Sequence, residues 1–101
     1  MKGISHSFDW DDANAKKCEK HGVSIAEVEF LFVHTPAVYP DLRHSEEESR
    51  YFAVGRSSEG RSVLVVFTYR QRDGKFIIRP ISARYMHRKE IKKFKSHEKE
   101  T

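Results

Sequence analysis

Three segments with the composition of β-strands follow one another in the second half of the chain, and short turns join them. Residues 50–57, 62–69 and 75–83 are rich in Val, Ile, Phe and Tyr, which favour extended backbone. Ser58-Glu59-Gly60 and Asp73-Gly74 lie between them and are typical turn sequences. Strands joined by turns this short run antiparallel, so we expect a meander at the centre of the fold.

The stretch before these strands is predicted to form a short strand and a helix. Residues 4–10 alternate apolar or aromatic side chains with polar ones, which is typical of a strand with one buried face. Asp11 and Asp12 then favour a helix start, because a carboxylate caps free N–H groups and interacts favourably with the helix dipole. We expect this helix to end near Lys20, since Gly22 can take the left-handed conformation that stops a helix.

A second helix has the clearer start signal. Ser24-Ile25-Ala26-Glu27 is a capping box, in which the serine hydroxyl and the glutamate carboxylate each accept a hydrogen bond from a free backbone N–H. Val23 and Val28 have the spacing of a hydrophobic staple across this start. The apolar stripe that follows predicts an amphipathic helix that ends before Pro36.

The remaining segments complete an α+β pattern. Residues 37–39 favour a short strand, and Pro80 marks the last long strand as an edge strand or a bulged one. A basic helix is expected from residue 85 or 86 to Lys95, followed by a flexible tail at 96–101. The order β-α-α-β-β-β-β-α predicts a single domain over residues 1–101, with helices packed on an antiparallel sheet.

Composition excludes several classes of protein. The longest apolar run, Val63–Phe67, is far too short to span a membrane, and the N-terminus lacks the apolar core of a secretion signal. The single cysteine, Cys18, cannot form an internal disulfide and is expected to be a small buried helix residue. We therefore expect a cytoplasmic protein without a membrane partner.

Charge is distributed unevenly along the chain. Residues 1–49 hold five Lys and Arg against ten Asp and Glu, a net charge of −5, and include an acidic loop at 41–48. Residues 50–101 hold fourteen against five, a net charge of +9. A basic half favours a polyanionic partner such as nucleic acid, because each cation near a phosphate releases a condensed counterion. The acidic stretch could instead meet a basic partner protein.

The Asp73-Gly74 turn predicts the register of the last two long strands. With these as the two turn residues, Arg72 faces Lys75, Arg70 faces Ile77 and Thr68 faces Arg79. Arg70 and Arg79 are then diagonal neighbours ~7–8 Å apart at Cα, a spacing at which one phosphate can bind both guanidinium groups. The alternative is that these arginines reach into water or bind carboxylates of the acidic loop.

Alternation along these strands assigns side chains to two faces of the sheet. One face is expected to hold Arg70 and Arg79 together with Val66, Thr68, Ile77 and Ile81. The opposite face is expected to pack on the helices through Phe67, Tyr69, Phe76 and Ile78.

Several short strings resemble, in their order, the BrnT family of toxins from bacterial type II toxin–antitoxin modules. The strings are Phe8-Asp9-Trp10-Asp11, Lys20-His21-Gly22-Val23-Ser24, His44-Ser45, Gly55-Arg56, Phe67-Thr68-Tyr69-Arg70 and Ile81-Ser82-Ala83-Arg84. The resemblance extends from Phe8 to about Glu90. In the first helix the chain departs from many relatives, because that helix is one residue shorter and Asn14 stands near a position where they have lysine.

The resemblance implies a compact RelE-like fold and a ribonuclease that stops translation. It also implies neutralisation by a BrnA-type antitoxin, a ribbon-helix-helix DNA-binding protein. DNA would then be a partner only indirectly, through the toxin–antitoxin complex that represses its own operon. No cofactor is implied.

Metal-independent RNA cleavage needs a base for the 2′-hydroxyl, cations for the charged phosphorane and an acid for the departing 5′-oxygen. Arg70 and Arg84 lie in the Thr-x-Arg and Ser-Ala-Arg strings of the family, so the resemblance assigns them phosphate binding and transition-state stabilisation. Arg79 is expected to support them. The alternative for Arg84 is an ion pair that holds the final helix.

Lys20 and His21 are the next candidates for catalysis, because a histidine can act as base or acid near neutral pH. Their alternative role is structural, since cations are favoured at a helix C-terminus. Tyr85 could stack on a base or donate a proton, or it could simply be a packed aromatic residue at a strand–helix junction. His44 and His87 are further candidate proton donors.

Arg56 and Arg88 complete the expected RNA-binding set. Arg88 begins a basic run to Lys95 that fits an RNA-binding helix, a partner helix or a solvated terminus. The six histidines are scattered, so no metal site is expected. A non-catalytic module that binds RNA or a partner protein is the alternative function, and a purely structural interaction protein is a third.

Overall fold

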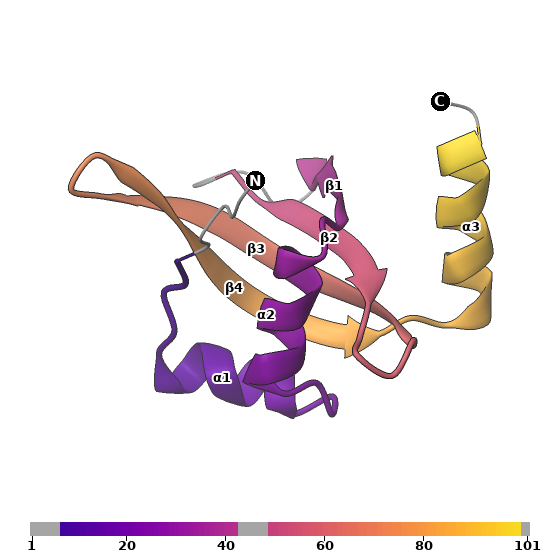
Figure 1. Cartoon of the computed structure of the whole chain (residues 1–101), viewed down its shortest axis with the longest axis horizontal. Helices are drawn as coiled ribbons and strands as arrows, with labels where there is room; N and C mark the ends of the chain where they lie inside the picture. The colour runs from indigo at the N-terminus through magenta and orange to yellow at the C-terminus, as the bar shows by residue number, and fades with distance from the viewer. Residues whose placement is uncertain (1–6, 43–48, 100–101) are drawn as a thin grey trace.

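The computed structural model describes residues 7–42 and 49–99, with side chains described up to Phe94. Within these ranges the elements are α1 (Asp12–Glu19), α2 (Ile25–Val33), β1 (Ala37–Pro40), β2 (Tyr51–Arg56), β3 (Ser62–Arg72), β4 (Lys75–Tyr85) and α3 (Arg88–Lys99). The strands form one antiparallel sheet in the order β1-β2-β3-β4. The helices α1 and α2 lie together on one side of it, and α3 stands apart at one end (Figure 1). The predicted α+β fold is confirmed.

Both N-terminal helices begin at the predicted caps. The Asp11 carboxylate accepts a hydrogen bond from the Asn14 N–H at 2.8 Å, and the Ser24 hydroxyl accepts one from the Glu27 N–H at 3.1 Å. Gly22 ends the turn after α1 with a φ of 86°, the left-handed conformation expected there. Local polar contacts therefore determine where both helices start, and a glycine conformation ends the turn after α1.

The second half of the predicted capping box is replaced by a tertiary contact. The Glu27 carboxylate accepts hydrogen bonds from the backbone N–H and the hydroxyl of Ser58, the latter at 2.8 Å. Ser58 lies in the β2–β3 turn, so this glutamate connects the start of α2 to the sheet. A carboxylate can satisfy either set of N–H groups, and packing of α2 on the sheet brings Ser58 within reach.

Of the predicted first strand, residues 4–6 lie outside the described residues, and the rest forms a single bridge. Phe8 pairs in parallel with Ile78 at the outer edge of β4, with hydrogen bonds of 2.8 and 2.9 Å on either side. The Trp10 indole N–H donates to the Glu29 carboxylate at 3.0 Å, which ties this segment to α2. The segment therefore covers part of the edge of β4.

The predicted register of the β3–β4 hairpin is confirmed, including the pairs Arg72–Lys75, Arg70–Ile77 and Thr68–Arg79. A β-bulge follows, because Phe67 pairs with Pro80 while Val66 pairs with Ser82. The extra residue, Ile81, changes the alternation of β4. Arg79 and Arg84 are five residues apart and would face opposite sides of a regular strand, but the bulge brings them to the same face.

The hydrophobic core lies between this sheet and the two N-terminal helices. Its buried members are Cys18, Val23, Val28, Leu31, Phe32, Ala53, Val63, Val65, Phe67, Ile78 and Ala83. Gly55 allows the close approach of α2 to β2, because a Cβ there would lie 3.1 Å from Leu31 Cγ. Cys18 is fully buried as predicted, and burial raises the pKa of its thiol to about 11.

Two of the four aromatic and aliphatic residues expected to pack on the helices do not do so. Phe67 and Ile78 are buried, but Tyr69 is 45% exposed and Phe76 is 69% exposed. The eleven-residue strands β3 and β4 extend ~36 Å, whereas α1 and α2, of eight and nine residues, are only ~12–14 Å long. The helices are too short to cover the end of the hairpin.

The final helix starts later and ends later than expected. Because β4 continues to Tyr85, α3 begins at Arg88 rather than at residue 85 or 86, and it continues to Lys99 beyond the predicted end at Lys95. Residues 96–99 of the predicted tail are therefore helical, and 100–101 lie outside the described residues. In the described ranges, no helix is both long enough and apolar enough to cross a membrane.

Asn14 tests how α1 packs on β4. Its side chain is buried, and its Nδ2 has no hydrogen-bond partner among the described residues. An unsatisfied buried amide costs ~1–3 kcal/mol, so Asn14→Leu is expected to raise the midpoint of thermal unfolding by a few degrees. Asn14→Asp is the matched control, because it keeps the shape but buries a charge, and it is expected to lower the midpoint. A lower midpoint for Asn14→Leu would contradict the packing described here.

Candidate functional site

The face of the sheet that α1 and α2 leave uncovered carries the arginines of β3 and β4. A cavity of about 510 Å³ lies between this open face and α3. Its lining residues are Pro40, Asp41, Leu42, Phe52, Leu64, Arg84, Glu90, Lys93 and Phe94. Because Arg84 pairs with Leu64 across β3 and β4, its position on this face depends on the bulge. The cavity therefore has an apolar floor with charged groups at its wall.

Arg84 forms a two-pronged ion pair with Glu90 of α3. Its Nη1 donates to Glu90 Oε1 at 2.7 Å and its Nη2 donates to Oε2 at 2.6 Å. Glu90 Oε1 also accepts the His87 N–H at 3.0 Å, so the same carboxylate caps the start of α3. The Arg84 hydrogen bonds are the main reason that the pKa of Glu90 falls to about 2. The alternative predicted for Arg84, an ion pair that holds the final helix, is the arrangement found.

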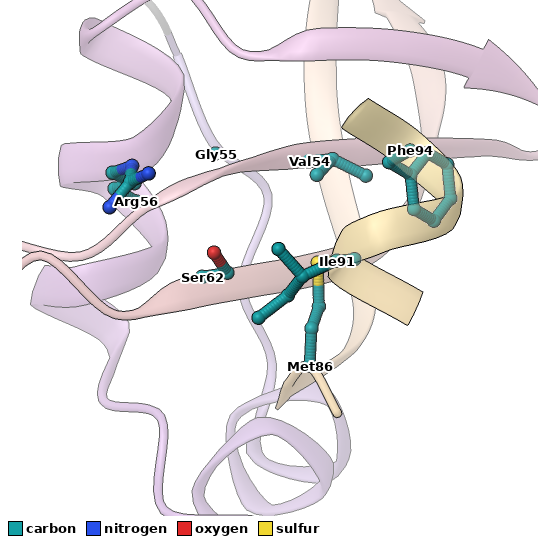
Figure 2. Close-up of a pocket in the computed structure, with 7 residues that line it drawn as sticks. All are labelled: Val54, Gly55, Arg56, Ser62, Met86, Ile91 and Phe94. Atoms are coloured by element: carbon teal, nitrogen blue, oxygen red, sulfur yellow. The ribbon is translucent and has the colours of Figure 1, made fainter. Parts of the chain in front are cut away.

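Apolar side chains of α3 also lie against the sheet. Phe94 contacts the ring of Tyr39 at a centroid distance of 5.2 Å. Ile91 and Phe94 also line a second cavity of about 100 Å³ with Val54 and Met86, as Figure 2 shows. The Arg84 side chain remains 40% exposed beside the larger cavity, so a solute can reach its guanidinium group.

Arg79 is held by carboxylates of the N-terminal segment. Its Nη1 lies 3.1 Å from Asp9 Oδ2 and its Nη2 lies 2.6 Å from Asp11 Oδ2. The pKa of Asp11 is lowered, first by the backbone hydrogen bond from Asn14 and then by Arg79. The alternative for Arg79 was that it reaches into water or binds carboxylates of the acidic loop; the carboxylates that it binds here are Asp9 and Asp11, in the segment that leads into α1. Residues 43–48 of that loop, including His44, lie outside the described residues.

Arg70 and Arg84 do not meet in one pocket. They share the open face of the sheet. Arg84 pairs with Leu64 of β3, and Leu64 and Arg70 are six residues apart in that strand. Six residues of strand correspond to ~20 Å. Arg70 is exposed, and it belongs to none of the ion pairs found in the described part of the chain. The predicted Arg70–Arg79 diagonal exists, but Arg79 already binds two carboxylates.

Lys20 and His21 lie in a different part of the molecule from Arg84. They are exposed in the turn between α1 and α2, where the Tyr85 hydroxyl donates to the Gly22 carbonyl at 3.5 Å. The guanidinium carbon of Arg61 lies 3.6 Å from the centre of the Tyr85 ring. Tyr85 directly follows Arg84 in the strand and therefore points to the opposite face of the sheet. Tyr85 is half-buried, as the packed-aromatic alternative predicts.

The two remaining RNA-binding candidates lie at the start of α3 and at the end of β2. Arg88 is its first residue and is exposed. Arg56 donates to the Gly60 carbonyl at 3.2 Å and lines the smaller cavity, at a distance from Met86 and Ile91 in Figure 2. Among the described residues, no three His, Cys, Asp or Glu side chains are grouped as metal ligands.

The sequence did not identify which carboxylates bind the arginines, because these contacts are tertiary. Glu90 follows His87 by three residues, which is the spacing of a capping glutamate and could have predicted its local role. Nothing in the sequence shows that the same carboxylate would bind Arg84. Pro80 predicted either an edge strand or a bulge, so the sequence did not determine the bulge that turns Arg84 to the open face.

Comparison with known proteins identifies one family. The family model described as "Ribonuclease toxin, BrnT, of type II toxin-antitoxin system" matches residues 10–90. The matched region includes the sheet, α1, α2 and the Arg84–Glu90 pair, and it leaves out most of α3. A search of curated proteins found no match.

The Arg84–Glu90 pair predicts a specific acid response. A carboxylate whose pKa is lowered to about 2 from 4.5 stabilises the fold fully above pH 4.5 and loses that contribution as the pH falls towards 2. Glu90→Gln is therefore expected to be less stable than the parent at pH 7, and the difference should disappear between pH 4.5 and 2. Chemical unfolding at several pH values measures it. Glu59→Gln, at an exposed turn, is the control, and a pH-independent gap for Glu90→Gln would contradict the pair.

Proposed function

This chain belongs to the family of BrnT ribonuclease toxins of type II toxin–antitoxin systems, and from that membership we propose how it acts. It is a metal-independent endoribonuclease that cleaves cellular RNA in the cytoplasm and thereby inhibits translation. A BrnA-type antitoxin neutralises it. The observation that carries this proposal is the family match over residues 10–90, and the basic open face beside α3 supports it.

Arg84 is the proposed phosphate-binding residue. A phosphate and a carboxylate bind a guanidinium group through the same pair of parallel hydrogen bonds, so an RNA phosphate can take the place of Glu90. The cavity beside the pair supports this exchange, because it gives the phosphate access to Arg84 without unfolding of the sheet. Glu90 must then release Arg84 when RNA binds. As cleavage proceeds, the arginine stabilises the negative charge that develops on the phosphorus oxygens.

Two described histidines compete for the proton transfers. His21 and Lys20 lie beside Tyr85, across the sheet from Arg84. His87 is exposed, and its backbone N–H donates to the same Glu90 oxygen that Arg84 Nη1 contacts. The backbone of His87 therefore lies at the Arg84–Glu90 pair, and its imidazole is the proposed group that exchanges a proton with the RNA at Arg84. His21 and Lys20 stay candidates for a second contact at the end of β4.

A non-catalytic RNA-binding or partner-binding module is the second candidate function. It is favoured by the ion pairs of Arg79 and Arg84, since an arginine that is neutralised within the fold is less available to a transition state. Such a module would bind RNA through its unpaired cations and leave it intact.

Cleavage in the presence of a chelator separates these two functions. Purified protein is incubated with a long RNA and excess EDTA, and the fragments are quantified. Arg84→Ala is expected to slow cleavage by ~100-fold or more, and His87→Ala by a similar factor, because each removes a group that acts in the transition state. Lys17→Ala, which removes a charge from the exposed side of α1, is the control.

Each outcome of this experiment has a clear meaning. Cleavage by the parent protein that Arg84→Ala does not reduce would contradict the role of Arg84. Slower cleavage by His21→Ala but not by His87→Ala would assign the proton transfer to His21 in place of His87. RNA that is bound but intact would support the binding module.

Growth provides an independent test in cells. Production of this chain alone in bacteria is expected to stop growth, and Arg84→Ala should restore it while the variant accumulates as folded protein. Simultaneous production of a BrnA-type antitoxin should restore growth with the parent chain. Normal growth with abundant folded parent protein would contradict a toxin.

A further inference from the structure

The hairpin of β3 and β4 extends beyond the rest of the sheet. Pairing with β2 ends at Tyr51–Phe67, and on the other side the N-terminal segment bridges β4 at Ile78. Residues 69–77, here called the hairpin arm, continue past both neighbours and pair with each other around the Asp73-Gly74 turn. Figure 1 shows the arm projecting from the body of the molecule, at the end of the sheet opposite α3.

One face of the hairpin arm presents two aromatic rings to solvent. Phe76 and Tyr69 lie edge to face with their centroids 6.0 Å apart. Tyr69 rests on Phe67 and Tyr51 at 5.3 and 5.5 Å, so the row of rings continues from the buried core outwards. Among the described residues, Phe76 has no ring neighbour other than Tyr69. Its outer face is therefore available to a ligand.

The aromatic pair has a structural explanation, but that explanation does not account for its exposure. Diagonal aromatic neighbours stabilise a two-stranded hairpin, and this arm needs such support because it has no third strand. Leucine or a β-branched residue would supply similar contact. The row ends instead in Phe76, a large aromatic side chain that is 69% exposed to solvent.

Three cations lie on the same arm as these rings. The hairpin arm carries Arg70, Arg72 and Lys75 against the single acid Asp73, a net charge of +2. Arg72 lies 3.7 Å from Asp9 but remains 63% exposed. Arg70 and Lys75 belong to none of the ion pairs in the part of the chain that the structure describes. Alternation places the cations on the opposite face of the narrow arm from the rings, and arginine and lysine side chains are long enough to reach past its edge.

We propose that the hairpin arm is a stacking site for single-stranded RNA, in which Tyr69 and Phe76 bind bases and the neighbouring cations bind the backbone. The proposal rests on the proposed function, because it assumes RNA as the substrate. Open aromatic faces beside cations are the combination that binds single strands without sequence preference. A protein partner would be expected to need a broader apolar patch than two rings bordered by charges. Arg70 lies ~20 Å from Arg84, so the arm holds a stretch of RNA away from the cleaved bond.

Binding to uncleavable RNA tests this site separately from catalysis. The probe is a short, fluorescently labelled 2′-O-methyl oligoribonucleotide, which lacks the nucleophile, and its partner probe is an abasic oligomer of the same length. Tyr69→Leu with Phe76→Leu keeps apolar contact in the arm but removes both π faces. This variant is expected to bind the base-containing probe about tenfold or more weakly and the abasic probe as the parent does.

Controls assign each outcome. Phe76→Leu alone, at the more exposed position, is expected to show part of the loss, and equal unfolding midpoints show that the fold is kept. Arg70→Gln should weaken both probes, because it removes a backbone contact. Unchanged binding of the base-containing probe by the double leucine variant, or an equal loss for both probes, would overturn the stacking site. The stacking site would also be overturned if the double leucine variant kept RNA binding and lost antitoxin binding or self-association instead. Failure of the parent to cleave natural RNA would count against the proposed function but would leave this binding result intact.

Discussion

The antiparallel pairing of β3 with β4 is the constraint on which the other features depend. Its two-residue turn determines which residues face each other, and its bulge determines which face the later residues of β4 take. Ala83 consequently enters the core while Arg84 points to the open face and the cavity beneath α3. Without the extra residue at Ile81, these two side chains would exchange faces. The arrangement of the candidate site is thus a consequence of strand geometry.

Ion pairs attach both peripheral segments to this hairpin. Arg79 holds the chain before α1 through Asp9 and Asp11, and Arg84 holds the start of α3 through Glu90. Both arginines belong to a strongly basic half of the chain, and both find their carboxylates in segments that border the sheet. The same guanidinium group can serve the fold or an RNA phosphate, because the two anions use the same hydrogen-bond geometry. For Arg84, accessibility beside a cavity makes an exchange of partners feasible.

The open face and the hairpin arm give the protein two regions suited to a polyanion. Arg84 and Lys93 lie at the α3 end, and Arg70 lies at the other end, in the arm that also carries the exposed aromatic rings. The two ends are connected by one continuous pair of strands, so their separation is determined by strand length. The described part of the chain could therefore contact RNA over more than one nucleotide while it keeps a small core.

Local signals in the sequence determined much of this structure. Asp11, Ser24 and Gly22 predicted the helix boundaries, and Asp73-Gly74 predicted the hairpin register, because caps and tight turns depend on residues close in the chain. The candidate arginines were identified partly through a family resemblance. Only the tertiary structure decided that Glu27 binds Ser58, that Arg84 binds Glu90 and that Tyr69 and Phe76 remain exposed. Those outcomes depend on the bulge and on the relative lengths of helices and strands. Both affect which remote segments come into contact, and such contacts form only when the chain packs.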